Sequence, residues 1–423
     1  SGGREHAIAW KLSQSKKISR IFIGPGNAGT GEAGINLKIN PEDFEEVKKA
    51  VSDNDIKMVV VGTEAPLAGG IHDYFLNHPH LKDVPVIGPV KNAARLEWSK
   101  DFAKSFMTRH GIPTASYRSF GKDEFDDALA YLASLTPPYV LKADGLAAGK
   151  GVLIISNYEQ AASELREIME GKFGKAGEKV LIEQFLDGIE LSVFIITDGK
   201  SYKLLPSAKD YKRIGEGNRG LNTGGMGAIS PPPFVDEVMM DKVTTRVIEP
   251  TLAQLKKDGI PYVGFIFLGM IEVNGEPFVI EYNTRMGDPE TEVVLPLLKT
   301  DLVEVMEAVV EHRLDELTVE WHPDTAVCVV MTSPGYPGSY PTGLPIQGLP
   351  TPFGESRVAV FHAGTKRESG RVVTAGGRVL AVTAWGPSLL DARAQVYQAV
   401  PSILFEGRHY RTDIAHRAFP HKI

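Results

Sequence analysis

Strand-like and helix-like segments alternate through the first hundred residues. Short apolar runs at residues 21–23, 57–61 and 84–88 each reach a glycine turn, and residues 41–51 between the first two runs have helical spacing behind Asn40. Strands that alternate with helices and turn at their carboxyl ends are typical of a parallel α/β sheet. Ligands of such sheets lie beyond the carboxyl ends of the strands, which makes these turns the first region to search for a site.

After residue 99 the pattern favours paired strands. Apolar runs at 139–143 and 152–155 flank a glycine-rich turn, and runs at 262–273 and 277–282 meet at Asn274-Gly275, so two hairpins are expected. Residues 206–233 are rich in glycine and proline and predict a long loop. Further helices are expected at 99–110, 158–171, 300–313 and 389–400, and further strands at 180–185, 190–197 and through the last hundred residues.

The composition limits the class of protein. The 423 residues correspond to two or three domains of about 150 residues each. Apolar residues make up 43 %, which excludes general disorder, and the formal charge of −7 argues against a nucleic-acid binder. The single cysteine, Cys328, excludes an internal disulfide and a cysteine-based zinc site, and its apolar neighbours predict a core position.

No apolar run reaches the roughly 18 residues that a membrane span needs. We therefore expect a soluble, cytoplasmic protein without a membrane partner. Separately, we expect a monomer that does not bind nucleic acid. Residues 1–4 read as a glycine-rich turn with no strand in front of it, and we expect the given sequence to start after the first strand of the parallel sheet.

Two stretches match the dinucleotide-binding pattern G-x-G-x-x-G, at residues 24–29 and 215–220. The pattern requires a preceding strand and a following helix whose first turn meets the pyrophosphate. The first match continues with too many glycines for a helix, and no helix follows the second. A turn, or a nest of backbone N–H groups that receives an anion, is therefore favoured, and a nicotinamide-dependent dehydrogenase stays an alternative.

A glycine- and alanine-rich segment between Lys142 and Lys150 lies inside the first expected hairpin. It is not a P-loop, because only three residues separate Gly145 from Gly149 and Gly151 stands where that motif has Ser or Thr. We interpret it as a flexible loop that covers phosphate oxygens, with Lys142 as a point charge on the strand. A purely structural hairpin is the alternative.

A second glycine-rich loop follows Asn222 and contains Gly224, Gly225 and Gly227. Residues without a Cβ atom let the backbone approach a ligand closely, and successive N–H groups can receive an anion. A disordered linker is the alternative.

Glu281 and Asn283 lie two apart on an expected strand, so both side chains leave the same face. A carboxylate and an amide oxygen suit Mg²⁺, because phosphates and water complete its octahedral coordination. Arg285 follows and could offset charge on a phosphoryl group in transfer. The alternative is an ion pair of Glu281 with Arg285 on an edge strand.

Together these motifs resemble the ATP-grasp superfamily and, within it, the phosphoribosylamine–glycine ligase family. The resemblance covers nearly the whole chain and rests on the blocks at 2–7, 25–30, 64–67, 142–152, 222–227 and 287–291. It implies a multidomain fold of α/β and α+β parts. The expected parts are a Rossmann-like parallel-sheet domain (1–98), an ATP-grasp domain (99–318) with a mobile lid at about 115–187, and a strand-rich C-terminal domain (319–423).

The family resemblance implies a reaction. Family members join glycine to 5-phosphoribosylamine with cleavage of ATP to ADP and phosphate, giving glycinamide ribonucleotide in de novo purine biosynthesis. The glycine carboxylate takes the γ-phosphate to give glycyl phosphate, which the ribosyl amine captures. The residues fit this chemistry, since a carboxylate needs a leaving group and the activated acid must meet the amine before water arrives. The implied cofactors are ATP and Mg²⁺ or Mn²⁺.

By position, the resemblance implies four groups of site residues. ATP would contact Lys104, Lys142, Gly149, Lys150, Gly151, Glu183, Phe185, Leu186 and Glu190. The metal ion would be held by Glu281 and Asn283. Glycine and the acyl phosphate would be framed by Arg285, Asp210, Asn222, Gly224 and Gly225. Phosphoribosylamine would be held by Gly3, Arg4, Glu5, Gly26, Asn27, Glu64 and Asp288.

The chain departs from the family pattern at a few positions. The block Gln-Asp-His-Lys-Arg of the family is Lys-Asp-Tyr-Lys-Arg at residues 209–213, Thr63 and Leu221 stand in place of prolines, and Ile189 in place of a glutamate. Because the Asp, Lys and Arg of the block are retained, the same substrates are expected. A ligase for another small carboxylate or amine, and a non-catalytic ATP-binding regulator, are the alternatives; a regulator would not need Arg285.

Overall fold

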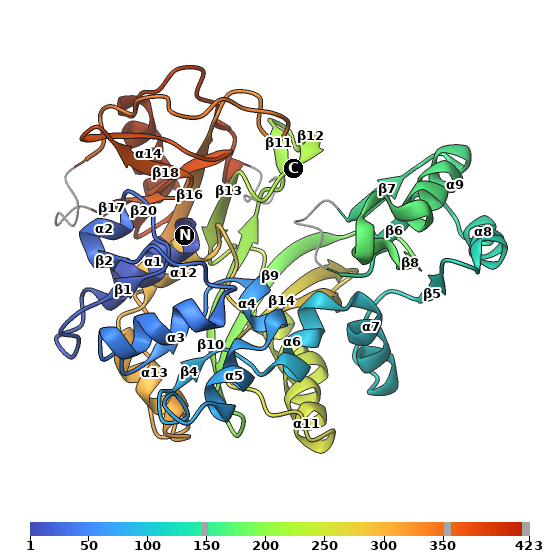
Figure 1. The fold of residues 1–423 in the computed structure, drawn as a ribbon. Coiled ribbons are helices and arrows are strands. Elements are labelled where there is room, and N and C mark those ends of the chain that lie inside the picture. Colours follow the sequence, from blue (N-terminus) through green and yellow to red (C-terminus); the bar gives the residue numbers. More distant parts are fainter. Residues whose placement is uncertain (146–150, 351–356, 417–423) are drawn as a thin grey trace.

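Two antiparallel sheets form the framework of the chain, one of eight strands and one of four (Figure 1). The structure is a computed structural model and describes residues 1–145, 151–350 and 357–416. Within these residues, none of the helices has the length and apolar character needed to cross a membrane.

The first hundred residues form two short parallel strand pairs. The parallel direction confirms the sequence prediction, although the two pairs are not joined into one sheet. A trough of about 960 Å³ is lined by one strand of each pair (residues 22–23 and 59–60), by Ser1 and by a later helix, α13 (Leu302–Val310). The strands are β1 (Phe22–Ile23) with β2 (Ile35–Asn36) and β3 (Val59–Val60) with β4 (Val86–Ile87). The helices are α1 (Gly3–Leu12), α2 (Thr30–Ala33), α3 (Phe44–Asp53), α4 (Glu64–Gly69), α5 (Ile71–Asn77) and α6 (Lys91–Trp98).

Three details of this region differ from the sequence prediction. The expected N-terminal turn is the start of α1, because the Glu5 carboxylate accepts the N–H of Gly2 at 2.5 Å and caps the first helical turn. The glycines after residue 29 do allow a helix, the four-residue α2. Helix α3 begins at Phe44 instead of residue 41, since the Asp43 side chain accepts two backbone N–H groups of its first turn.

The four-stranded sheet forms a separate lobe with two helices. Its order is β5-β8-β6-β7, and the pairing of β6 with β7 confirms the expected hairpin around the glycine-rich segment. Leu132 and Leu165 of the two helices are fully buried against the sheet together with Phe120. The lobe stands out from the rest of the chain in Figure 1. Its elements are β5 (Tyr117–Gly121), β6 (Tyr139–Ala143), β7 (Val152–Ile155), β8 (Lys179–Glu183), α8 (Phe125–Ala133) and α9 (Tyr158–Glu167), and α7 (Lys100–Arg109) leads into it.

The eight-stranded sheet has the order β15-β14-β9-β10-β13-β16-β20-β17. The expected hairpin of β14 and β15 is confirmed, and Asn274 and Gly275 at its turn have φ of 52° and 79°. Cys328 on β16 is fully buried, as predicted. The strands are β9 (Ile189–Thr197), β10 (Tyr202–Asp210), β13 (Gly227–Ser230), β14 (Gly264–Val273), β15 (Glu276–Asn283), β16 (Thr325–Thr332), β17 (Val358–His362) and β20 (Arg378–Gly386).

The prediction of a long loop at residues 206–233 is wrong. The segment holds the end of β10, the hairpin of β11 (Arg213–Gly215) with β12 (Arg219–Asn222), and β13. Strand β13 lies between β10 and β16 with all its residues buried, so tertiary pairing overrides its weak local signal. The second G-x-G-x-x-G match is the turn of the β11–β12 hairpin, which leaves the dehydrogenase alternative without a strand-to-helix turn there.

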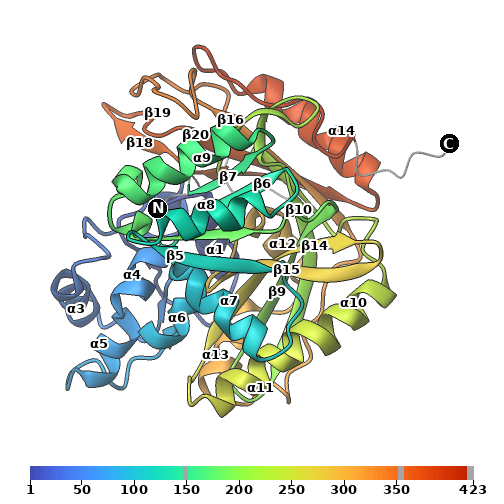
Figure 2. The ribbon, with the colours of Figure 1, turned by 90° about the vertical axis from the view of Figure 1, so that its right-hand side faces the viewer.

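Alternate side chains of the large sheet face two different helix layers. Phe194 and Ile196 pack with α12 (Thr291–Val294) and α13, whereas Val193 and Ile195 pack with α10 (Glu237–Val243) and α11 (Glu249–Lys257). Figure 2 shows α10 and α11 running along the sheet. The remaining described elements include α14 (Leu389–Ala399), β18 (Thr365–Glu368) and β19 (Arg371–Thr374) in the C-terminal part.

Candidate active site

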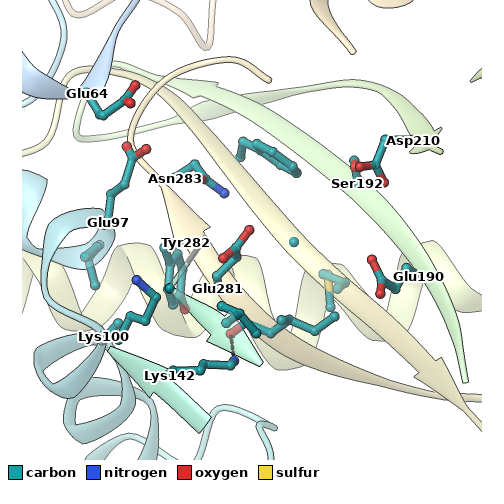
Figure 3. Close-up of a pocket in the computed structure, with 18 of the residues that line it drawn as sticks. Glu64, Glu97, Lys100, Lys142, Glu190, Ser192, Asp210, Glu281, Tyr282 and Asn283 are labelled. Atoms are coloured by element: carbon teal, nitrogen blue, oxygen red, sulfur yellow. Dashed lines mark hydrogen bonds between the residues drawn. The ribbon is translucent and has the colours of Figure 1, made fainter. Parts of the chain in front are cut away.

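A cleft of about 250 Å³ lies between the two sheets. Strands β6 and β8 contribute residues from the small sheet and β9, β10 and β15 from the large one. Helices α6 and α7 contribute Glu97 and Lys100, at the left in Figure 3. The predicted site residues that line it are Lys104, Lys142, Gly151, Glu183, Glu190, Asp210, Gly224, Glu281, Asn283, Arg285, Glu64 and Asp288.

Two lysines and a glutamate form the buried floor of the cleft. The Oε2 atom of Glu183 lies 2.9 Å from Lys104 Nζ and 3.0 Å from Lys142 Nζ. Burial would raise the pKa of Glu183, but Lys142 and Lys104 outweigh it and hold the pKa below its usual value. Burial lowers the pKa of Lys104 to about 8 despite the carboxylate.

The ammonium groups of Lys104 and Lys142 differ in how many hydrogen bonds they make within the described residues. Lys104 Nζ also donates to Thr114 Oγ1 at 2.8 Å and to the carbonyl of Ala115 at 3.2 Å. Besides Glu183, Lys142 Nζ contacts only the carbonyl of Ile280, at 3.4 Å, among the described residues. Lys142 is therefore the better placed of the two to bind an anion in the cleft.

Glu281 and Asn283 point into the cleft from β15, while Tyr282 between them points into the core (Figure 3). This confirms the prediction that the two side chains share a face. Neither the Glu281 carboxylate nor the Asn283 amide makes a hydrogen bond or ion pair with any residue that the structure describes, and Asn283 Nδ2 is buried. Gly269 on β14 makes room, since a Cβ there would lie 2.9 Å from Glu281 Cγ.

These two side chains fit a divalent cation. They supply one carboxylate and one amide oxygen whose protein partners are absent among the described residues, and phosphate and water oxygens would complete an octahedral shell. No group of three or more His, Cys, Asp or Glu residues suited to hold a metal occurs in the described part of the chain. The donor set therefore suits Mg²⁺ held jointly with a nucleotide, and not an ion held by the protein alone.

The opposite end of the cleft is acidic. Glu190 pairs with Lys212 at 2.6 Å and Ser192 Oγ donates to Glu290 Oε1 at 3.1 Å. Burial raises the pKa of Asp210, and burial together with the Asp210 charge raises the pKa of Glu290 to about 7. Ser192 and Glu290 were not predicted as site residues. Ser192 belongs to no motif, and from the block at 287–291 only Asp288 was assigned a role.

The predicted alternative of an ion pair between Glu281 and Arg285 is wrong. Strand β15 ends at Asn283, and Thr284 donates its N–H and Oγ1 to Glu97 at 2.7 and 3.0 Å. The chain therefore turns, and Arg285 Nη2 pairs with Glu97 at 2.6 Å instead. Arg285 Nε is buried without a hydrogen-bond partner in the part of the chain that the structure covers. Glu64 Oε2 lies 3.7 Å from it, beyond hydrogen-bond distance, so this N–H can still be donated to a ligand.

Residues from the N-terminal part reach the cleft through Asp288. Its Oδ2 accepts the N–H of Arg4 at 3.3 Å, and its Oδ1 pairs with Arg378 at 3.1 Å. The Arg4 side chain in turn pairs with Glu5 at 2.7 Å. Arg378 from β20, which also donates to the carbonyl of Gly224 at 2.5 Å, was not predicted, because no local pattern links it to these residues.

Asn27 and Gly26 have structural partners and do not line the cleft. Asn27 Nδ2 donates to the carbonyl of His362 at 2.6 Å and its Oδ1 accepts from Thr30 N at 3.0 Å. Gly26 has φ of 77°, and a Cβ there would lie 2.2 Å from Asn36 Oδ1. Their predicted contact with phosphoribosylamine remains a prediction.

Several other predicted residues also lie outside the lining of the cleft. Gly149 and Lys150 are outside the described residues. The N–H of Gly224, which does line the cleft, already donates to Tyr336 at 3.0 Å, and that of Gly225 donates to Thr223 Oγ1 at 2.9 Å. The remaining residues not among the lining are Gly3, Arg4, Glu5, Phe185, Leu186 and Asn222.

The departures from the family pattern at residues 63, 211 and 221 lie away from the cleft lining. Tyr211 is buried, its hydroxyl accepts the N–H of Ala415 at 3.2 Å, and Arg411 lies over its ring at 5.3 Å. Leu221 is 66 % exposed on β12. Tyr211 thus packs the C-terminal part against β10.

Glu292 provides a test of the packing beside the cleft. Its side chain is fully buried, and neither carboxyl oxygen has a hydrogen-bond partner in the described residues. Gly3 packs directly against this carboxyl, because a Cβ atom at position 3 would lie 2.2 Å from Glu292 Oε1. Burial, and then the charge of Asp288, raises the pKa of Glu292 well above 4.5. The carboxyl is therefore neutral in the folded chain at a pH where the unfolded chain ionises it, and stability falls as pH rises above 4.5.

We expect Glu292→Gln to raise the melting temperature at pH 7, because the amide keeps the shape and cannot ionise. The difference from wild type should shrink towards pH 4.5, where the carboxyl is neutral in both states. Thermal melts of both proteins across this pH range measure it. A variant that is less stable at every pH would contradict the assignment of a neutral carboxyl.

The comparisons with known proteins agree along the whole chain. The phosphoribosylglycinamide synthetase N domain matches residues 1–97, the ATP-grasp (A) domain 98–291 and the C domain 326–417. A phosphoribosylamine–glycine ligase of Chlorobaculum tepidum is 46 % identical over 99 % of this chain and 98 % of its own length, and that of Vibrio cholerae is 43 % identical over 99 % and 97 %. A bifunctional purine biosynthetic protein of Pichia angusta is also 46 % identical, and the chain spans 53 % of its length.

Solved structures agree with this result. The crystal structure of phosphoribosylamine–glycine ligase from Thermotoga maritima superposes with a TM-score of 0.84 at 35 % identity and covers 98 % of both chains. The biotin carboxylase domain of the Hydrogenobacter thermophilus 2-oxoglutarate carboxylase, in complex with MgADP, superposes with a TM-score of 0.71 at 16 % identity over 97 % of this chain and 90 % of that one, which shows a shared ATP-grasp fold. The chain therefore belongs to the phosphoribosylglycinamide synthetase family.

Proposed function

We propose that this chain catalyses the ATP-dependent ligation of glycine to 5-phosphoribosylamine, which gives glycinamide ribonucleotide, ADP and phosphate. The observation that carries the proposal is a single cleft in which buried lysines, two oxygen donors for a cation, an arginine Nε without a hydrogen-bond partner among the described residues and a set of carboxylates meet. The names of the full-length relatives state the same activity.

The floor of the cleft suits the phosphates of ATP. Lys142 would bind phosphate oxygens directly, and Lys104 would add positive charge from below. Glu281 and Asn283 would hold Mg²⁺ or Mn²⁺, which when bound neutralises charge on the phosphates during transfer. Gly151 lines this part of the cleft, and Glu190 at its far side would contact the ribose.

The middle of the cleft suits the glycine carboxylate. Arg285 is held by Glu97 through Nη2, which leaves its Nε for an oxygen of glycine or of the acyl phosphate. Asp210 and Gly224 lie across from it and would frame the amino acid. Phosphorylation gives the glycine carboxyl a leaving group, and the walls of the two sheets keep water from the acyl phosphate.

Phosphoribosylamine would enter from the N-terminal side. Glu64 and Asp288 line the cleft there, and Asp288 is tied to Arg4 and Arg378. Its amine would then face the acyl carbon of glycyl phosphate. Positioning of this kind replaces a bimolecular encounter by a reaction within one complex.

The direct test measures ADP release from ATP, with glycine and freshly prepared phosphoribosylamine each omitted in turn. Steady turnover should need all three substrates and a divalent cation, and a chelator should stop it. A parallel series with Mg²⁺ and Mn²⁺ compares the two ions. Turnover that does not depend on the amine, or that prefers another small carboxylate over glycine, would refute the proposal.

Lys142→Ala should weaken ATP binding roughly ten- to hundredfold, because a charged hydrogen bond to phosphate is lost. Isothermal titration calorimetry with ATP and Mg²⁺ measures the change. Lys122→Ala is the matched control, since Lys122 is an exposed lysine of the same lobe with no side-chain partner among the described residues. Equal ATP affinity of the wild type and of the Lys142 variant would contradict the assignment.

The small sheet should act as a lid. It projects from the rest of the chain (Figure 1), and Lys142 and Glu183 belong to its strands β6 and β8. ATP bound to these strands and to β15 together would hold the lid closed. We expect amide hydrogen exchange of β6 and β8 to slow when ATP and Mg²⁺ are added, as measured by mass spectrometry. Unchanged exchange would argue against closure.

A further inference from the structure

One carboxylate of the cleft has no role in the function described so far. Glu290 precedes α12 and lines the cleft together with Glu281, Asp210 and Asp288. It lies two residues after Asp288, which lines the side from which the amine would enter, and its hydrogen bond with Ser192 holds it at the acidic end of the cleft. The same short segment therefore joins Glu290 to Asp288, through which the N-terminal residues reach the cleft.

The side chain of Glu290 is buried and oriented, but it has no cationic partner among the described residues. Its side chain is 3 % exposed, and no lysine or arginine of the described residues forms an ion pair with it, in contrast to Glu183, which has two. Ser192 Oγ donates to Oε1 at 3.1 Å and fixes the orientation of the group. Gly287 leaves space for the other oxygen, since a Cβ there would lie 2.4 Å from Glu290 Oε2.

The reaction needs a proton acceptor at this place. When the neutral amine attacks the acyl carbon, its nitrogen becomes positively charged and must lose a proton before a stable amide forms. Asp288 and Glu64 on the amine side are weaker candidates than Glu290 for this proton acceptor, because Asp288 is paired with Arg378 and Glu64 with Arg285. A carboxylate without a cation partner is the more basic group.

We propose that Glu290 is the general base of the ligation step and takes the proton from the amine of phosphoribosylamine as it attacks glycyl phosphate. The inference rests on the proposed function. The nitrogen–carbon bond forms, the bond between the acyl carbon and the phosphate oxygen breaks with its electron pair leaving on phosphate, and the proton passes from nitrogen to a Glu290 oxygen. Glu290 then returns the proton to solvent, so no further reactant is needed.

Burial and the charges around Glu290 determine its pKa and therefore the pH range in which it can accept a proton. Asp210 and Lys212 from the β10 side, with Ser192 on β9, face it directly, and burial and Asp210 raise its pKa to about 7. The other charged groups of the neighbouring elements, Arg4 on α1 and Arg378 on β20, are tied to Asp288. The basic form therefore accumulates above pH 7, and ligation should rise with pH up to that value and then level off.

The test separates the two halves of the reaction in Glu290→Gln. Formation of glycyl phosphate without amine is followed by exchange of ¹⁸O between the β,γ-bridge and non-bridge positions of ATP in the presence of glycine. This exchange should stay within a factor of about 3 of wild type, whereas kcat for ligation should fall about 10²- to 10⁴-fold. The rise of kcat with pH near neutrality should disappear in the variant.

A second amine substrate, hydroxylamine, distinguishes a general base from a residue that only supports the structure of the site. Hydroxylamine is a less basic amine that needs less help to lose its proton, so the deficit of the variant should shrink to about tenfold or less when glycine hydroxamate is the product. Glu290→Asp should recover part of the ligation rate and the pH dependence. If the glutamine variant does not fold, the aspartate variant and the wild-type pH profile carry the test.

Each remaining outcome overturns the inference. Loss of the isotope exchange with a raised KM for glycine would assign Glu290 to the ammonium group of glycine. An unchanged ligation rate, or an equal deficit with both amines, would remove the role of base. If instead the wild type shows no ligation of glycine to the amine, the proposed function itself fails, which the ADP assay shows before any variant is made.

Discussion

Glu281→Ala should lower kcat at least about 10³-fold, which corresponds to about 4 kcal/mol of transition-state stabilisation. The side chain supplies the carboxylate oxygen of the cation pair, and Asn283 alone offers only a neutral ligand beside the phosphates. The fold should survive, because the carboxylate makes no hydrogen bond or ion pair with the described residues whose loss would destabilise it.

The measurement combines turnover at several Mg²⁺ concentrations with thermal melting of the variant. Glu276→Ala is the matched control, since Glu276 lies on the same strand but pairs with Lys242 on the surface. The control should keep its activity and its requirement for Mg²⁺. A Glu281 variant that turns over with an unaltered Mg²⁺ requirement would refute the assignment of the ligand.

Glu183→Ala should destabilise the chain by about 3–5 kcal/mol, the usual cost of removing one partner from a buried ionic group. The carboxylate lies between two buried ammonium groups at 2.9 and 3.0 Å, and no other carboxylate pairs with Lys104 or Lys142 among the described residues. Without it, two positive charges remain close together in a site shielded from water. Their mutual repulsion and desolvation favour the unfolded chain or the loss of a proton from one lysine.

Urea or thermal unfolding of the Glu183 variant measures this cost. The stability should recover at high pH, where one of the lysines becomes neutral, and in part on addition of ATP, whose phosphates replace the missing negative charge. Glu124→Ala, which removes an exposed carboxylate from the same lobe, is the control. Equal stability of the Glu183 variant and wild type would mean that the three groups are not coupled.

Local patterns predicted the parts of the structure that are set by neighbours in sequence. The hairpin at Asn274 follows from a turn that prefers positive φ, and the shared face of Glu281 and Asn283 follows from the two-residue period of a strand. Lys142 was predicted from its place beside the glycine-rich segment and Lys104 from the family resemblance, and both lie in the cleft with them.

Long-range contacts could not be predicted in this way. Glu97 and Glu290 line the cleft from distant parts of the chain, and Arg378 pairs with Asp288 of the lining, and only the folded chain brings these residues together. Strand β13 was missed for the same reason, because its four residues become a strand through pairing with β10 and β16 and not through their own propensity. The protonation behaviour of Glu290 depends on burial that no sequence window records.

The continuity of the eight-stranded sheet bears on how the chain is made. Strand β13 pairs on one side with β10 and on the other with β16, which lies about a hundred residues later in synthesis. A nascent chain that stops before residue 325 therefore presents β13 as an open edge, the kind of edge that recruits strands from other chains. We therefore expect the large sheet to be completed only after residues 325–332 have been synthesised, and a chain truncated before residue 325 should aggregate instead of forming an active shorter enzyme.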